Sequence, residues 1–79
     1  MNKDSLENYV KEVFSLIKTD AKKAKLESEN SKTEDAKYNS GYLMAYHMVI
    51  SRMKSQVWVF GLDEAALGLD DIDPERDLL

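Results

Sequence analysis

Three groups of side chains in this sequence could do chemistry, and the first is the single histidine, His47. A histidine that acts as a general base needs a carboxylate to orient it and a nucleophile within hydrogen-bond reach. On a helix its neighbours lie three and four residues away, where Ser51 could form a hydrogen bond but no Asp or Glu occurs. We therefore expect a half-buried histidine at the edge of an interface, and we predict no catalytic residue and no enzyme activity.

The second group is a run of carboxylates between Asp70 and Glu75. A calcium loop needs oxygen ligands at alternate positions, glycine at the sixth and glutamate at the twelfth. Counted from Asp71, the sixth residue is Arg76, and counted from Asp63, the third and fifth residues are apolar. Because the sequence also lacks cysteine, we predict neither a metal site nor a cofactor.

The third group is basic: Lys18, Lys22 and Lys25 share one helix face, and Lys23 lies beside it. Such a face can hold phosphates, but no aromatic side chain lies among these lysines and the net charge is −4. We expect a solvated face and keep a nucleic-acid-associated role for the Lys18–Lys25 face as the alternative function. A further possibility is that an acidic segment, from the same chain or a partner, lies near these lysines.

Charge is distributed unevenly along the chain. Residues 1–60 contain ten Lys and Arg against eight Asp and Glu, whereas residues 61–79 contain Arg76 against seven acidic residues, a charge of −6. This asymmetry is typical of a tail or docking segment.

The 79 residues allow one domain with little core. No signal peptide or membrane-spanning run is visible, so we expect a cytoplasmic protein with no membrane partner.

Apolar residues at steps of three and four predict a first helix over residues 4–28, with Asp4 and Glu7 as a capping box at its start. The apolar stripe thins to alanine, so the far end should either pack closely or fray. Residues 27–35 contain no large apolar side chain and predict a short connection between two antiparallel helices. A second capping box, Ser31 with Glu34, would start the second helix.

The second helix is predicted over residues 32–60, although residues 39–41, Asn-Ser-Gly, are typical of a turn. The residues on both sides keep helical spacing, and an internal glycine costs only about 1 kcal/mol relative to alanine. We predict a continuous helix in which Gly41 and Ala45 let the first helix come close. The alternative is a helix that begins at residue 39 or 40, after a separate turn over residues 32–38.

This second helix carries more apolar surface than one neighbour can cover. Its main stripe is Tyr38, Tyr42, Ala45, Val49, Met53, Val57 and Phe60, and a flanking edge is Leu43, His47, Ile50 and Lys54. The excess predicts a homodimer in which two hairpins form a four-helix bundle. The expected interface residues are Tyr42, Ala45, Tyr46, Val49, Ile50, Met53, Val57 and Trp58. The same aromatic and methionine surface, or the acidic C-terminal segment, could also bind another protein.

The C-terminal segment, residues 61–79, contains three signals that end or begin helical turns. Gly61 is expected to end the second helix at C′, Gly68 to end a short turn capped by Asp63, and Asp73-Pro74 to start another turn. Its leucines and isoleucine are too many for a free acidic tail. We therefore predict that the segment packs on the helices of its own or a partner chain.

The run GYLMAYHMVISRMKSQVWVFGLDEAALGLDDIDPERDLL resembles the C-terminal half of small uncharacterised bacterial helical proteins, in which a helix leads into FG and then GLDDIDP. The resemblance covers about half of the chain and includes no catalytic motif. It implies an ordered C-terminal segment and no particular activity.

Together these patterns predict an all-α protein, a long antiparallel helical hairpin with short C-terminal helical turns, forming a single domain over residues 1–79. They favour a non-enzymatic adaptor or regulatory module that acts as a homodimer.

Overall fold

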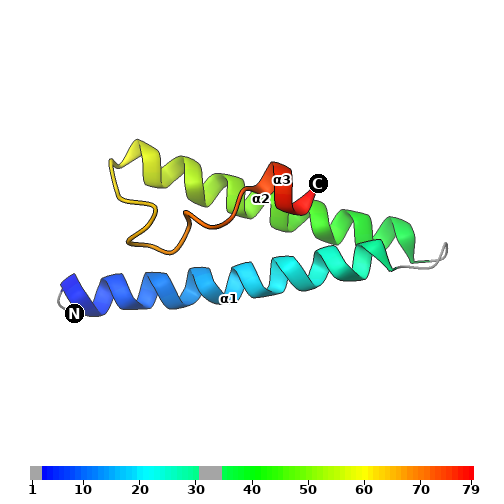
Figure 1. The fold of residues 1–79 in the computed structure, drawn as a ribbon, viewed down its shortest axis with the longest axis horizontal. Helices are drawn as coiled ribbons and strands as arrows, with labels where there is room; N and C mark the ends of the chain where they lie inside the picture. Colours follow the sequence, from blue (N-terminus) through cyan, green and yellow to red (C-terminus); the bar gives the residue numbers. More distant parts are fainter. Residues whose placement is uncertain (1–2, 31–34) are drawn as a thin grey trace.

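The computed structural model describes residues 3–30 and 35–79, and every regular element in these ranges is helical. The elements are α1 (Lys3–Glu29), α2 (Ala36–Val59) and α3 (Pro74–Leu78). α1 and α2 run antiparallel as a hairpin, and the chain beyond α2 turns back along them to reach α3 (Figure 1). The predicted all-α hairpin with a short C-terminal helix is confirmed at the level of the single chain.

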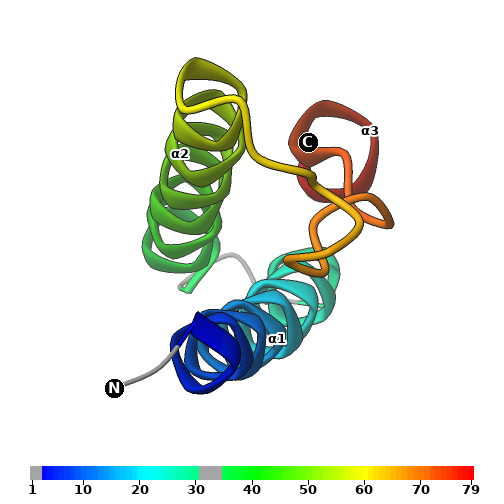
Figure 2. The same cartoon turned by 90° about the vertical axis from the view of Figure 1, so that its left-hand side faces the viewer.

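The core lies where three parts of the chain meet. A view along the helices shows α1, α2 and the C-terminal segment at the corners of a triangle (Figure 2). All three contribute to the buried apolar cluster, which consists of Ala21, Ala24, Leu43, Ile50, Val57, Leu69, Ile72 and Leu78. Burying one leucine or isoleucine side chain contributes about 1.5–3 kcal/mol before conformational entropy is subtracted. The segment after α2 is therefore an integral part of the domain, docked on its own chain.

α1 differs in detail from the sequence prediction. It extends to Glu29, one residue beyond the predicted end at residue 28 and into the stretch that was also expected to begin the connection. Asp4 lies within the first turn instead of capping it, where its negative charge still favours the positive end of the helix dipole. At the far end Ala21 and Ala24 are fully buried, so the small side chains mark close packing there. The proposed cap by Ser31 and Glu34 falls outside the described residues.

α2 runs without a break through Gly41, as predicted, and the alternative start at residue 39 or 40 is wrong. Its N-cap residue, Asp35, makes no side-chain capping hydrogen bond. The expected role of Gly41 in close helix packing is also wrong, because no atom beyond its chain neighbours and the adjacent backbone of α2 lies within 4 Å of where its Cβ would be. Gly41 faces solvent, and α1 packs on another side of α2.

The face of α2 that enters the core contains Leu43 and Ile50, which sequence analysis treated as a flanking edge, together with Val57 from the predicted main stripe. Leu43, Ile50 and Val57, each seven residues from the next, are buried, as expected for one face of a helix contacted along its length. Tyr38 and Phe60, from the predicted main stripe, are exposed. The core thus occupies one apolar edge of α2 and leaves the neighbouring stripe uncovered by its own chain.

α2 ends in a Schellman motif built on Gly61. The Gly61 N–H donates to the carbonyl of Trp58 at 3.0 Å and the Leu62 N–H donates to the carbonyl of Val57 at 2.9 Å. Gly61 has a φ of 64°, a left-handed conformation that glycine adopts without steric penalty. The predicted C′ role of Gly61 is confirmed, and the motif turns the chain back toward α1.

The two later turns also follow their local sequence. Asp63 accepts a hydrogen bond from the Ala65 N–H at 3.0 Å, and the turn ends at Gly68, which has a φ of 75°. Asp73 is the N-cap of α3 and Pro74 is its first residue. These short-range patterns place Leu69, Ile72 and Leu78 against the hairpin in a segment with little regular hydrogen bonding of its own.

Gly41 within α2 and Gly61 just after its C-cap give a paired test of backbone conformation. We expect Gly41→Ala to raise the free energy of unfolding by about 0.5–1 kcal/mol, because the position is helical and the added methyl meets nothing. Gly61→Ala should lower it by about 1–2 kcal/mol, because the left-handed backbone strains any L-residue. Urea unfolding followed by circular dichroism measures both changes. A loss of stability in Gly41→Ala would contradict the open surroundings of that position.

The contribution of the C-terminal segment can be measured in the same way. Ile72→Ala should lower the free energy of unfolding by about 2–5 kcal/mol, as for other large-to-small core substitutions. Leu62→Ala, at an exposed position of the same segment, should change it by less than about 0.5 kcal/mol. Equal effects of the two variants would show that the segment does not form part of the core.

Candidate functional site

His47 has a carboxylate partner that its neighbours in sequence did not reveal. Its Nε2 lies 3.3 Å from Oε1 of Glu75, a residue of α3 that is 28 positions away. The histidine side chain is 15% exposed and that of Glu75 is 75% exposed. Sequence reasoning searched one turn of α2 on either side and missed this contact. Only the prediction that the acidic segment packs on the helices pointed toward it.

This histidine–carboxylate contact does not by itself make a catalytic site. Within the described residues, Nδ1 of His47 is enclosed and has no hydrogen-bond partner, and Nε2 contacts only Glu75. Among the described residues, therefore, no hydroxyl group is held against either ring nitrogen. A shallow hollow of about 330 Å³ lies beside His47 and includes Ser51. What the geometry does show is a polar contact that links α3 to α2.

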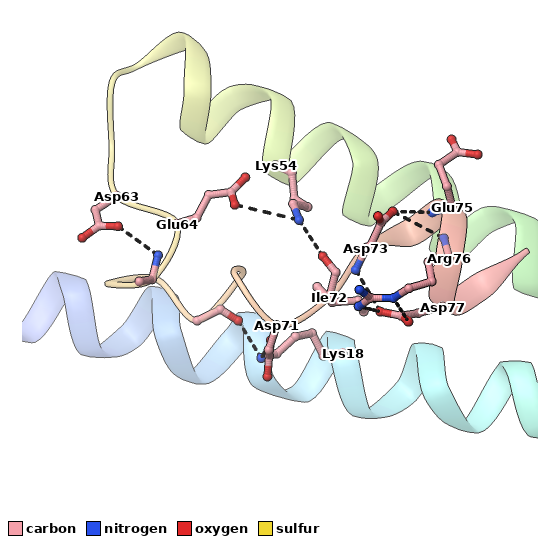
Figure 3. A network of polar contacts seen from close by, with 12 residues as sticks. Lys18, Lys54, Asp63, Glu64, Asp71, Ile72, Asp73, Glu75, Arg76 and Asp77 are labelled. Atoms are coloured by element: carbon pink, nitrogen blue, oxygen red, sulfur yellow. Dashed lines mark hydrogen bonds and ion pairs between the residues drawn. The ribbon is translucent and has the colours of Figure 1, made fainter.

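Lysines from both long helices hold the main chain of the C-terminal segment (Figure 3). Lys18 of α1 donates to the carbonyl of Gly68 at 2.6 Å and to Oδ1 of Asp71 at 2.8 Å. Lys54 of α2 donates to the carbonyl of Ile72. Carbonyls in an irregular segment must find donors when apolar neighbours exclude water, and these ammonium groups supply them.

A third lysine reaches the end of the segment. Lys25 donates to the carbonyl of Leu79 at 3.2 Å and lies 3.4 Å from Oε1 of Glu29. Two members of the predicted basic face, Lys18 and Lys25, are thus in contact with the acidic segment of the same chain. Lys22 and Lys23 remain exposed. A phosphate that approached this face would compete with contacts that the chain already makes.

The carboxylates of Asp73 and Asp77, in the stretch that sequence analysis compared with a calcium loop, form separate hydrogen bonds within the C-terminal segment. Oδ1 of Asp73 accepts from the Glu75 N–H at 3.0 Å and from the Arg76 N–H at 3.4 Å. Asp77 accepts from the Asp73 N–H at 2.9 Å and from the guanidinium of Arg76. Within residues 3–30 and 35–79, no three His, Asp or Glu side chains are placed together to hold a metal ion.

Three acidic side chains among the described residues have shifted pKa values for identifiable reasons. The hydrogen bond from Lys18 holds the pKa of Asp71 below its usual range. The Arg76 guanidinium and the Asp73 N–H together lower the pKa of Asp77. The hydrogen bond with Tyr42 raises the pKa of Tyr46 to about 12. Both lowered values belong to the C-terminal segment, so the docked segment favours the ionised forms of Asp71 and Asp77.

The predicted interface residues do not all share one environment. Tyr42 is 42% exposed, Val49 is 45% exposed and Trp58 is 83% exposed. Of the rest, Ile50 and Val57 belong to the buried core, Ala45 is exposed, and Tyr46 and Met53 are half-buried. Tyr42, Ala45 and Val49 lie on one uncovered side of α2, whereas Trp58 lies half a turn around the helix from Val49.

Tyrosines line one end of this surface. The rings of Tyr38 and Tyr42 stack with centroids 6.2 Å apart, and Tyr42 meets Tyr46 edge-on at 5.2 Å. The hydroxyl oxygens of Tyr42 and Tyr46 are 3.4 Å apart. Aromatic rings offer large contact areas at little conformational cost, and they are enriched in binding hot spots.

The other end of the surface is hollowed. A groove of about 360 Å³ lies between α1 and α2 and includes Phe14, Met53 and Phe60 in its lining. A second hollow of about 400 Å³ adjoins it, with Leu6 and Leu62 in its walls. Both are mainly apolar, so this part of the molecule can receive side chains from another surface.

Comparisons with protein-family models, with curated proteins and with solved structures found no match to this chain. None of the helices, in the part of the chain that the structure describes, is both long and apolar enough to cross a membrane. The candidate site is therefore defined by its own geometry: the uncovered apolar face of α2, beside a C-terminal segment held by lysines.

Docking of the segment should depend on acidity through Asp71. Its pKa is lower in the folded chain than in the unfolded chain. Its ionised form therefore stabilises the fold above about pH 4. This contribution is lost as the pH falls through the folded value. Asp71→Asn should lower the free energy of unfolding at neutral pH by at most about 1 kcal/mol, since the carboxylate is largely exposed.

The measurement is the difference in unfolding free energy between Asp71→Asn and the parent chain across the acidic range. We expect the difference to vanish well below pH 4. Asp70→Asn is the control, because it removes the same charge from an exposed neighbour that forms no ion pair with the described residues. A difference that is independent of pH would show that the contact between Lys18 and Asp71 does not stabilise the docked segment.

Proposed function

We propose that this chain is a small non-enzymatic interaction module that works as a homodimer, an adaptor or regulator in the cytoplasm. Two hairpins pair through the uncovered apolar face of α2 and form a four-helix bundle, with the C-terminal segments outside the seam. The observation that carries this proposal is the amount of apolar surface that one copy leaves in water.

The accessible surface of the chain is large for its size. It measures 5838 Å² for 9.0 kDa. A compact monomer of that mass exposes roughly 4,850 Å², about 1,000 Å² less. The excess accompanies an elongated shape, 48 Å long and 21 by 16 Å across. Each partner in a standard protein interface buries about 800 Å², so covering one long face would remove an area of this order.

Much of the uncovered surface is apolar. The large hydrophobic side chains exposed on α2 and at its end are Tyr38, Tyr42, Met44, Met48, Val49, Trp58, Val59, Phe60 and Leu62. Monomeric soluble proteins seldom leave contiguous apolar patches of more than a few hundred Å² in water. A second copy that pairs with one side of α2 would cover the members on that side, which include Tyr38, Tyr42, Val49 and Phe60, without a further gene product.

The alternative of nucleic-acid association depends on the Lys18–Lys25 face. In the structure Lys18 and Lys25 contact the acidic segment of their own chain. Phosphate binding there would therefore have to displace the segment or rely on Lys22 and Lys23. No observation favours an enzyme, since the contact of His47 with Glu75 brings no nucleophile with it. Dimerisation through α2 uses surface that the chain leaves free.

The proposal is tested by measuring molar mass with light scattering at micromolar concentration. We expect the parent chain to have the mass of two copies. Val49→Glu should weaken the dimer at least about tenfold, because an unpaired carboxylate would be buried in the seam. Met44→Glu is the matched control: both residues are 45% exposed, but Met44 lies about 140° around the helix from Val49.

Two results would contradict the proposal. One is a parent chain that has the mass of a single copy even at high micromolar concentration. The other is a dimer that Val49→Glu and Met44→Glu weaken equally, which would leave α2 without a defined seam.

A further inference from the structure

One exposed line of residues on α2 is free of charge along its whole length. Its members are Tyr38, Tyr42, Ala45, Val49, Met53, Gln56 and Phe60, hereafter the α2 stripe. Six members are exposed, and Met53 is partly buried at the edge of the core. The charged residues of α2 are Lys37, Arg52 and Lys54, and none belongs to the α2 stripe. A line of this kind, free of charge and about 33 Å long at 1.5 Å per residue, suits a helix–helix contact.

The spacing within the α2 stripe is symmetric about Val49. Going outward in either direction, the steps are four, three and four residues. These steps keep close to the 3.6-residue turn, so the line hardly drifts around the helix and a straight neighbour can follow it. Two antiparallel copies of α2 that cross at Val49 would therefore place every member of the stripe opposite another member.

We propose that the homodimer is an antiparallel, two-fold pairing of α2 with α2 whose axis passes beside Val49. This inference rests on the proposed function, because it assigns the geometry of the dimer. In a two-fold contact each residue meets its counterpart reciprocally. Val49 meets Val49, Ala45 meets Met53, Tyr42 meets Gln56, and Tyr38 meets Phe60 of the second copy.

The chemistry of these pairs is complementary. Ala45 is small where Met53 is large, so the longer side chain has space next to the axis. The Tyr42 hydroxyl and the Gln56 amide can hydrogen-bond each other, which satisfies two polar groups inside an otherwise apolar seam. At each end Tyr38 and Phe60 bring two aromatic rings together, an arrangement that favours offset or edge-on stacking.

The other elements of the chain contact α2 mainly on sides other than the α2 stripe. The C-terminal segment contacts α2 through Lys54 and His47, on another side of the helix from the α2 stripe. α1 packs against the buried edge that includes Leu43 and Ile50. The groove between α1 and the Met53, Gln56 and Phe60 end of the stripe is a place that side chains of the second copy would fill.

Single cysteines test the axis and the direction, because the chain has no cysteine of its own. We expect Val49→Cys to form a disulfide-linked dimer under mild oxidation, at least tenfold faster than Met44→Cys. Tyr42→Cys and Gln56→Cys should each cross-link poorly alone. When mixed, with one copy carrying a size tag, they should cross-link to each other. A disulfide needs Cβ atoms about 3.5–4.5 Å apart, so only facing positions react quickly.

Light scattering of each cysteine variant first shows whether it is still a dimer. The cross-linking rates then distinguish the possible pairings. Rapid cross-linking of Tyr42→Cys to itself would show a parallel pairing and overturn the inference. A dimer in which neither Val49→Cys nor the mixture reacts faster than Met44→Cys would show that another face pairs, and the proposed homodimer would survive. A chain with the mass of one copy at every concentration would overturn both.

Discussion

The docking of the C-terminal segment against the helical hairpin is the interaction on which the rest of this structure depends. Two antiparallel helices alone would leave Ile50 and Val57 in water on one side. The segment covers that side with Leu69, Ile72 and Leu78, so the core has three walls. A chain this short buries a smaller share of its surface than a longer one does, and these three side chains form a large part of its core. The segment between α2 and α3 is therefore as necessary to the fold as the helices.

The lysine contacts follow from the irregular backbone of that segment. Outside its short turns, its carbonyls lack the regular partners that a helix would give them, and an unpaired buried carbonyl is unfavourable. Lys18 and Lys54 extend from the two helices and donate to the carbonyls of Gly68 and Ile72. Their alkyl chains can cover apolar surface while the ammonium groups reach the backbone. Lys18 of the basic face also pairs with Asp71, so one lysine binds both the backbone and an acidic side chain of the segment.

Much of this fold follows from local sequence rules. The steps of three and four predict both long helices, and the roles of Gly61 and Asp73 follow from capping chemistry that involves only neighbouring residues. The orientation of α2 does not follow in the same way. Periodicity fixes the angles between side chains but not which of two adjacent apolar edges faces the core. That choice depends on Leu69, Ile72 and Leu78, whose positions result from turns that come later in the chain.

The candidate site shows the same limit. Tyr42 and Val49 were identified from helical spacing, and the structure leaves both uncovered. Ile50 and Val57 were grouped with them, but the chain buries these two residues itself. The contact between His47 and Glu75 joins residues 28 positions apart, so no rule based on neighbours could find it. Sequence spacing located the apolar helix, and only the tertiary structure separated its core edge from its free edge.

That separation is also what makes a symmetric partner plausible on physical grounds. A surface that binds a different protein needs complementarity to that protein but no internal symmetry. In a two-fold contact, each residue must instead fit the residue that lies opposite it on the second copy. The α2 stripe meets this requirement about Val49, and Gln56 would give the pairing a preferred register. A slip of one helical turn would leave the amide of Gln56 away from the Tyr42 hydroxyl and bring positions outside the stripe into the seam. An unsatisfied polar group in an apolar seam is unfavourable by about 1–3 kcal/mol, enough to favour one register over its neighbours.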